Sequence, residues 1–238
     1  MEIIAEIGQN HNGDIGLAKE LIYSVKDSGA DVAKFQLFDM NFWEKIYDNN
    51  PEIKQTWQNY HQKTCLSNES IVSLIELCDK LNIEFMCSVF NEHFIDFVEN
   101  FNVKRYKLAS NSIFNKNLLN KLIQTNKELI ISLGHWKKNK LPNFKSKNKI
   151  SYLYCISNYP TKFDDLNFNK IDFNKYDGFS DHTIGLDASY IALSRGAKII
   201  EKHITLDKKM EGPDHEGSIT PNELKKLVKF KNNLILSL

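Results

Sequence analysis

Two histidines of this chain lie where predicted β-strands end, and each is embedded in polar residues. His182 lies in the stretch 180–183 and His203 in the stretch 201–205. If consecutive strands of a parallel barrel carry these stretches, both imidazoles reach the same rim of the barrel. Imidazole nitrogens are common ligands of divalent metals, so the pair could share one ion. This arrangement predicts an enzyme that uses a metal.

Each of these histidines also has a plainer interpretation, because a single strand-end histidine could be a hydrogen-bonded core residue. The pair is 21 residues apart, which is one strand–helix unit and favours metal binding. Glu201 precedes His203 by two positions, so it points to the same face of the strand and could orient that imidazole.

His11 is equally a substrate-facing residue or a turn residue. Three others are interpreted as surface histidines: His61, His93 and His135.

Lysines and serines at neighbouring strand ends indicate an anion site beside the metal. Lys34 and Lys107 are flanked by apolar residues, which implies burial, and a buried ammonium needs a partner. Ammonium and hydroxyl groups suit phosphate or carboxylate, so we expect a phosphorylated substrate beside a Lewis acid. Taken singly, the serines could equally fill a layer of the barrel interior. The other polar residues predicted at this rim are Glu6, Gln36, Ser88, Ser110, Ser132, Ser157, Tyr159 and Ser180.

The charge balance excludes whole classes of partner. With 31 basic and 30 acidic residues the formal net charge is +1, so no broad field favours nucleic acid or an anionic membrane.

The four cysteines are scattered and lack the spacing of a zinc ribbon or redox motif, so we expect reduced, mostly buried thiols. The sequence shows neither a leader nor a run of membrane-spanning length. A cytoplasmic protein is expected.

Short apolar runs alternate with amphipathic stretches along most of the chain. Gly29 ends the first predicted helix, Ser67 caps the second and Pro221 opens the last. The predicted strands span 2–6, 32–36, 84–88, 103–108, 128–132, 150–155, 177–179 and 198–202. The predicted helices span 14–28, 67–81, 117–125, 186–194 and 221–236.

This alternation predicts an α/β protein with a parallel sheet, and eight units in 238 residues favour a closed (β/α)8 TIM barrel. A single domain over residues 1–238 is expected. Two stretches depart from this alternation of strands and helices. The aromatic-rich stretch 39–64 is interpreted as a functional loop, either a lid over the substrate or a dimer contact. Residues 135–149 have no apolar face, so the helix after strand five is expected to be degenerate or absent.

Several longer strings resemble the sialic acid synthase (N-acetylneuraminate synthase) family, and they follow one another from the first strand to the last helix. A further matching string is Tyr159-Pro160-Thr161. The long strings are AEIGQNHNGD at 5–14, GADVAKFQ at 29–36, SDHTIG at 180–185, GAKIIEKH at 196–203 and GPDH at 212–215.

The resemblance implies a barrel enzyme that condenses phosphoenolpyruvate with an aldose, commonly an N-acetylated hexosamine. The products would be a 3-deoxy-2-ulosonic acid and phosphate, used in surface polysaccharide biosynthesis. Such enzymes hold Mn²⁺ or Mg²⁺ on histidines that match His182 and His203. They tend to form homodimers. Catalytic roles are implied for Glu6, Lys34, Lys107 and Asp214, and substrate contacts for Gln36, Ser88, Ser110, Ser132, Ser157, Tyr159 and Ser180.

The chain departs from the family pattern mainly on the sugar side. Ser112 stands where the family has a glutamate, and Ser88-Val89-Phe90 replaces a usual Ser-Thr-Pro. The sequence ends at Leu238, and we expect a protein without the family's small C-terminal antifreeze-like domain. These departures predict an acceptor other than N-acetylmannosamine and leave open one without the acetamido group. Two alternatives stay open: a metal-dependent retro-aldol enzyme and a non-catalytic sugar-binding barrel.

Overall fold

A computed structural model describes residues 1–138 and 140–238 of the chain. Eight parallel strands form a closed barrel in sequence order, and β1 pairs with both β2 and β8. Each lies within two residues of its predicted bounds at either end, and the predicted TIM barrel is confirmed. The strands are β1 (Glu2–Gly8), β2 (Val32–Leu37), β3 (Glu84–Val89), β4 (Arg105–Leu108), β5 (Glu128–Ser132), β6 (Ile150–Cys155), β7 (Gly178–Asp181) and β8 (Ile199–His203).

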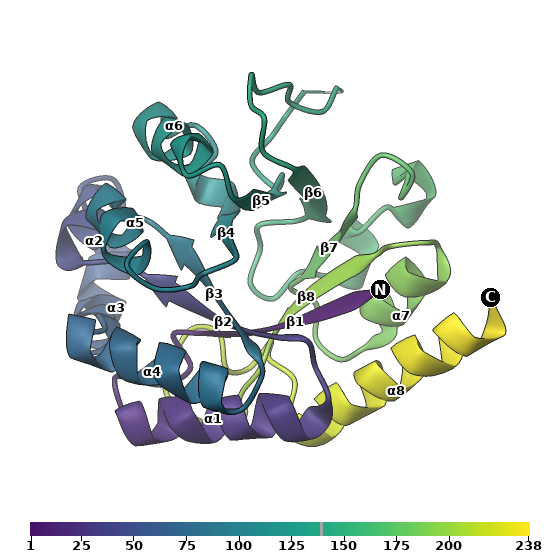
Figure 1. Cartoon of the computed structure of the whole chain (residues 1–238), viewed down its shortest axis with the longest axis horizontal. Helices are drawn as coiled ribbons and strands as arrows, with labels where there is room; N and C mark the ends of the chain where they lie inside the picture. The colour runs from purple at the N-terminus through teal and green to yellow at the C-terminus, as the bar shows by residue number, and fades with distance from the viewer. Residues whose placement is uncertain (139) are drawn as a thin grey trace.

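Helices cover most of the outside of the barrel (Figure 1). The five predicted helices are confirmed to within one residue at each end, and α5 after β3 was not predicted. The helices are α1 (Ile15–Ser28), α2 (Met40–Tyr47), α3 (Pro51–Thr64), α4 (Asn68–Lys80), α5 (Glu92–Val98), α6 (Lys116–Gln124), α7 (Asp187–Ser194) and α8 (Pro221–Ser237). None of them is both long and apolar enough to cross a membrane.

The interpretation of 39–64 as a loop is wrong, because the stretch folds into the helices α2 and α3. Asp39 caps α2 by accepting a hydrogen bond from the Phe42 amide. Proline stands at the start of α3, where a missing N–H costs nothing. Only Tyr60, His61 and Thr64 of α3 are buried, so its apolar periodicity is too weak to reveal a helix in the sequence.

The expected loss of the helix after β5 is confirmed for the described residues. Between Ser132 and Ile150 the described chain contains no helix, and Figure 1 shows irregular backbone beside β5 and β6. After β6 the chain forms two single-turn 3₁₀ helices, Phe163–Asp165 and Phe168–Lys170. The helical layer is therefore incomplete on this side of the barrel.

The barrel interior is packed at its centre and polar at its carboxyl end. A small apolar layer fills the centre, and at the amino end Arg105 forms ion pairs with Glu2 and Glu84. The parallel register then aligns the polar residues across strands: Glu6 stands beside Lys34 on β2 and beside His203 on β8. Backbone pairing thus gathers the polar side chains at one rim. The apolar layer comprises Ile4, Val32, Met86, Ile130, Leu153 and Ile199.

Candidate active site

A polar pocket lies at the carboxyl end of the barrel and contains two buried lysines. Lys34 forms an ion pair with Glu6, a second with Glu201 at 3.2 Å, and a hydrogen bond to the Ser88 hydroxyl at 3.0 Å. Lys107 lies 3.3 Å from Glu201. All four charged side chains are almost inaccessible to solvent. Two ammonium and two carboxylate groups thus balance one another where no bulk water screens them.

The two lysines are not equivalent. Burial lowers the pKa of Lys34, but the charges of Glu201 and Glu6 outweigh burial and raise it above its usual value. For Lys107 burial prevails over the attraction of Glu201, and the pKa is lowered. Lys107 has one ion pair and no hydrogen bond among the described residues. Of the two buried lysines, Lys107 therefore has more unused hydrogen-bonding capacity.

Glu201 occupies a different place from the one predicted. Instead of orienting His203, its carboxylate bridges Lys34 and Lys107 and accepts a hydrogen bond from Ser180 at 2.7 Å. Burial alone would raise its pKa, but the two ammonium charges and the Ser180 hydroxyl hold the pKa well below its usual range. The side chain is anionic at neutral pH and acts as the shared counter-ion of the pocket.

His182 and His203 face each other on the neighbouring strand ends. Their ring centroids are 6.2 Å apart, and the rings are inclined by 54°. His182 Nδ1 donates to the Ile156 carbonyl at 2.7 Å, which leaves a lone pair on Nε2. His203 Nδ1 is buried without a hydrogen-bond partner among the described residues and lies 3.9 Å from Asp214 Oδ2. The two rings are spaced to reach one ion between them, because metal–nitrogen bonds are about 2.0–2.1 Å.

The protein supplies few ligands beyond this pair. Among residues 1–138 and 140–238 no group of three or more histidine, cysteine, aspartate or glutamate side chains is placed to hold a metal. The His182 tautomer and the orphaned His203 nitrogen fit a two-histidine site with open positions for water and substrate oxygens. Burial first, and then the neighbouring His203, lower the pKa of His182 to about 4, so the ring is neutral and able to ligate.

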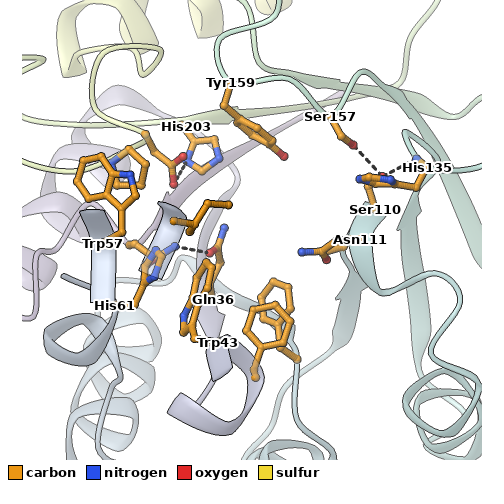
Figure 2. Close-up of a pocket in the computed structure, with 17 residues that line it drawn as sticks. Gln36, Trp43, Trp57, His61, Ser110, Asn111, His135, Ser157, Tyr159 and His203 are labelled. Atoms are coloured by element: carbon orange, nitrogen blue, oxygen red, sulfur yellow. Dashed lines mark hydrogen bonds and ion pairs between the residues drawn. The ribbon is translucent and has the colours of Figure 1, made fainter. Parts of the chain in front are cut away.

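A larger cavity of about 410 Å³ opens above the lysine pocket and shares lining residues with it. Figure 2 shows Trp43 and Trp57 on one side of this cavity and Ser110 and Asn111 on the other. His203 and Tyr159 lie at the top of the cavity in this view, and the centroid of the Tyr159 ring is 4.2 Å from that of the His182 ring. This volume lies within the usual range for small-molecule sites.

Every residue that the sequence predicted for the site lines one of these adjoining pockets. Ser110 accepts hydrogen bonds from the His135 backbone amide at 2.8 Å and from Ser157 at 3.0 Å. The Ser132 hydroxyl is buried with no hydrogen-bond partner among the described residues. The gathered residues are Glu6, Lys34, Gln36, Ser88, Lys107, Ser110, Ser132, Ser157, Tyr159, Ser180, His182, His203 and Asp214.

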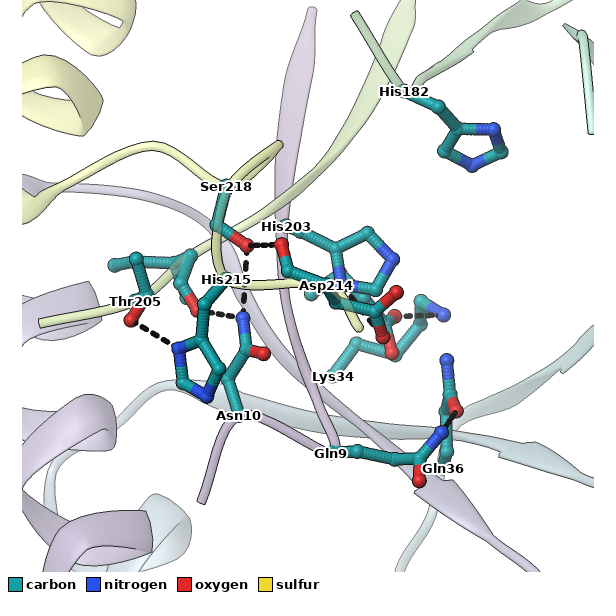
Figure 3. A network of polar contacts seen from close by, with 12 residues as sticks. Gln9, Asn10, Lys34, Gln36, His182, His203, Thr205, Asp214, His215 and Ser218 are labelled. Carbon is teal, nitrogen blue, oxygen red and sulfur yellow. Dashed lines mark hydrogen bonds and ion pairs between the residues drawn. The ribbon is translucent and has the colours of Figure 1, made fainter. Parts of the chain in front are cut away.

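A hydrogen-bond network holds the loop that carries Asp214 (Figure 3). The Asn10 amide donates to Ser218 and to the Ile204 carbonyl, both at 2.8 Å. Ser218 in turn donates to the Asp214 backbone carbonyl at 2.6 Å. The first strand–helix loop thus fixes the loop after β8, and Asp214 stays at the rim beside His203.

One of the three histidines expected at the surface is buried. His61 is not a surface histidine: it is 2 % exposed, stacks on Trp43 at 3.4 Å and lies 2.7 Å from the Tyr47 hydroxyl. His135 is exposed as expected but also lines the cavity. His11 is fully buried and accepts a hydrogen bond from the Gly13 amide, which is a turn role. Ser112, at the position of the family's glutamate, is buried and donates to Asn111 at 3.1 Å.

Gln9 is a site residue that the sequence analysis missed. Its side-chain oxygen accepts from Thr64 at 3.0 Å, and its amide nitrogen lies 3.5 Å from Gln36 Oε1. A hydroxyl at the end of α3 therefore orients two amides that line the cavity. The partner residue is 55 positions away along the chain, so no local pattern could signal this contact.

Comparison with known proteins gives consistent matches over nearly the whole chain. Residues 21–238 match the NeuB family. The chain is 37% identical to the N,N'-diacetyllegionaminic acid synthase of Legionella pneumophila, over 95% of this chain and 70% of that protein. It is 32% identical to the N-acetylneuraminate-9-phosphate synthase of Mus musculus, over 95% and 68%. A crystal structure of N-acetylneuraminic acid (sialic acid) synthetase from Leptospira borgpetersenii matches with a TM-score of 0.86 and 30% identity, covering 99% of this chain and 85% of that one.

Proposed function

The chain belongs to the NeuB family, and from this premise we propose that it condenses phosphoenolpyruvate with an aldose. The products would be a 3-deoxy-2-ulosonic acid of the sialic acid type and inorganic phosphate. The observation that carries the proposal is the pairing of the Lys34–Lys107 pocket with the His182–His203 pair at one rim of the barrel. The first suits an enol phosphate, and the second suits the activation of an aldehyde.

Lys107 is the group best placed to receive the anionic substrate. It keeps only one ion pair, whereas Lys34 is engaged by two carboxylates and a serine. The Ser132 hydroxyl, buried without a hydrogen-bond partner among the described residues, adds a free donor to the same pocket. Together these groups can hold phosphate and carboxylate oxygens in place of water. Lys34 then positions Glu6 and Glu201 beside the reacting carbons.

A divalent metal, Mn²⁺ or Mg²⁺, is proposed to be held by His182 and His203. When bound it would act as a Lewis acid that polarises the carbonyl of the aldose. The hydrogen bond from His182 to Ile156 fixes the ring tautomer that ligation requires. The Asp214 carboxylate lies 3.9 Å from His203 and places a negative charge beside the proposed metal site.

The balanced reaction joins C3 of phosphoenolpyruvate to the aldehyde carbon, adds water at C2 and breaks the C2–O bond to phosphate. The attacking water loses both protons as its oxygen becomes the C2 carbonyl oxygen: one reaches the new alkoxide, and the other leaves with the phosphate. Glu201 and Glu6 face C2 with negative charge, which offsets the cationic character that develops there. Gln36 and Asp214 line the adjoining cavity and can bind sugar hydroxyls. Surface polysaccharide biosynthesis is the proposed setting, and a homodimer in the cytoplasm stays a prediction.

Phosphate release tests this proposal. The purified protein is mixed with phosphoenolpyruvate and a panel of N-acylated and unacylated aldoses, with Mn²⁺ or with a chelator. We expect phosphate only when aldose, phosphoenolpyruvate and metal are all present, and a product of the combined carbon number by mass spectrometry. A retro-aldol enzyme would instead cleave a ulosonic acid without releasing phosphate. A non-catalytic barrel would release nothing with any aldose.

A further inference from the structure

A buried ion pair lies on the outer face of the two strand ends that carry His182 and His203 (Figure 3 shows the two rings). Lys202 Nζ is 3.0 Å from Asp181 Oδ2, and both side chains are almost inaccessible to solvent. We propose that Asp181 and Lys202 are positioning residues, which set the spacing of the two histidines without touching a ligand. The inference rests on the proposed function, because it concerns the histidines that would hold the metal.

The alternation of side chains along β7 and β8 places this ion pair behind the histidines. Asp181 and Lys202 each directly precede a histidine, so their side chains point to the opposite face of the strand. The parallel register puts Asp181 beside Lys202, just as it puts Ser180 beside Glu201 on the inner face. The outer ion pair and the inner histidines therefore share the same two strand ends.

The ion pair holds Thr183, the residue that follows His182. Asp181 Oδ1 accepts hydrogen bonds from the Thr183 amide at 2.8 Å and from the Thr183 hydroxyl at 2.7 Å. Lys202 Nζ donates to the Thr183 carbonyl at 2.8 Å. Asp181 Oδ2 also accepts from the buried Ser189 hydroxyl on α7, which packs against both strands. The residues on both sides of His182 are thus fixed by one network.

This network continues the link between β7 and β8 past the end of their backbone pairing. The register of paired residues ends at positions 181 and 202, and Lys202 reaches Thr183 beyond it. On its other side His182 is bonded through its ring and its carbonyl to the chain after β6, at 2.7 and 2.8 Å. Loss of the ion pair would leave His182 fixed to that segment but free to move relative to β8, which carries His203.

Net stability does not account for a buried ion pair. Desolvation of two charges offsets much of their attraction, and an apolar pair of similar size is often at least as stable. What a fully hydrogen-bonded ion pair adds is one defined geometry, because each donor and acceptor needs its partner at hydrogen-bond distance. Two chelating histidines need such precision, and residues that orient metal ligands typically contribute about 10- to 100-fold in metal affinity.

The experiment measures Mn²⁺ binding by calorimetry in two double variants. The site variant, Asp181→Asn/Lys202→Met, removes both charges while the asparagine can still accept from Thr183. The control variant, Asp31→Asn/Lys231→Met, removes the pair of the buried Lys231 with Asp31, 2.9 Å apart at the amino end of the barrel. We expect the Kd for Mn²⁺ to rise about tenfold in the site variant and to stay at the wild-type value in the control variant.

A purely structural ion pair would change the melting temperature and leave the Kd of the folded protein unchanged. An unchanged Kd in the site variant, or an equal rise in both variants, would therefore overturn the inference. If the site variant does not fold, Ser189→Ala takes its place, because it removes only the hydrogen bond from α7 to Asp181. It should weaken Mn²⁺ binding by a smaller factor, and wild-type binding in Ser189→Ala would reject the positioning role.

Failure of the proposed metal site is distinguishable from failure of this inference. If the wild type binds no Mn²⁺, or His182→Ala binds it equally well, the metal site fails, and the tautomer of the His182 ring decides by nitrogen NMR. We expect the proton on Nδ1 in the wild type and in the control variant, because Ile156 accepts it. A mixture of tautomers in the site variant alone supports the positioning role, and the same tautomer in all three proteins rejects it.

Discussion

Lys107 Nζ lies 3.3 Å from Glu201 Oε1, and both side chains are almost fully buried at the carboxyl end of the barrel. Because the Glu201 carboxylate also pairs with Lys34, its negative charge does not fully neutralise Lys107. An ammonium in this position attracts an additional anion strongly, because little solvent screens it. The shared carboxylate thus partly neutralises each lysine and leaves the pocket receptive to a negatively charged ligand.

Replacing Lys107 should weaken binding of phosphoenolpyruvate. In Lys107→Met the shape of the side chain is largely kept but the charge is lost. Hydrogen bonds to charged groups contribute about 1.5–3 kcal/mol, so the KM for phosphoenolpyruvate should rise about 10- to 150-fold. Lys149→Met, at an exposed lysine that pairs with Glu128, is the control. An unchanged KM in Lys107→Met would contradict the assignment.

Loss of His182 should abolish stabilisation by metal. A ligand at 100 times its Kd that binds only the folded state adds about 2.7 kcal/mol to the free energy of unfolding. We therefore expect Mn²⁺ to raise the melting temperature of the wild type but not of His182→Ala. His93→Ala, at an exposed histidine, should keep the shift. A full shift in His182→Ala would show that the ion binds elsewhere.

Gly134 leaves room for three side chains of the site. A Cβ atom there would lie 2.3 Å from Ser157 Oγ, 2.7 Å from Cys155 Sγ and 2.9 Å from Ser110 Oγ. Gly134→Ala must displace both serines, and a displacement of about 1 Å in a binding site can cost about 100-fold in rate. We expect kcat/KM for phosphoenolpyruvate to fall at least tenfold while circular dichroism shows the barrel intact. Wild-type kinetics in this variant would remove both serines from the substrate site.

Tyr60 ties α3 to the first strand–helix loop. Its hydroxyl lies 2.9 Å from the Gln9 carbonyl and 3.0 Å from Asn12 Oδ1, and the side chain is 5 % exposed. Tyr60→Phe removes the hydrogen bond of this hydroxyl, while the Gln9 carbonyl still accepts from the Asn12 amide and Asn12 Oδ1 still contacts His215. The free energy of unfolding should therefore fall by about 0.5–1.5 kcal/mol in urea titrations. The same change at the half-exposed Tyr23 should have little effect. Equal stabilities of the two variants would argue against this anchoring role.

His11 should make the protein less stable as the pH falls. Burial lowers its pKa from 6.5 to about 4 in the folded state. Above pH 6.5 neither state binds the proton, and between about 6.5 and 4 only the unfolded state does. Stability therefore decreases toward low pH by up to about 1.4 kcal/mol per pH unit.

His11→Asn can keep the hydrogen bond from Gly13 without the titration. The free energy of unfolding of this variant should fall less steeply between pH 6.5 and 4.5 than that of the wild type. The two slopes should coincide above pH 7. Identical slopes over the acid range would mean that His11 is not held neutral by burial.

The sequence alone predicted the barrel and which residues line the site. Apolar runs of strand length alternate with helical stretches, and in a closed parallel barrel all strands end at the same rim. Any polar residue at the end of a predicted strand, such as Lys34 or His203, can therefore be placed near the others without knowing a single contact. That inference needs only local pattern and one rule of topology.

The tertiary structure decided how these residues are paired and what surrounds them. Glu201 and His203 lie on the same face of their strand, but the Glu201 carboxylate pairs with two lysines instead, because their positive charges attract it. His61 becomes a buried stacking partner of Trp43, and the stretch 39–64 becomes two helices that wall the cavity. These features depend on contacts between residues that are distant in sequence and on burial. A local pattern carries neither, so only the folded chain could show which ion pairs form and which wall of the cavity is apolar.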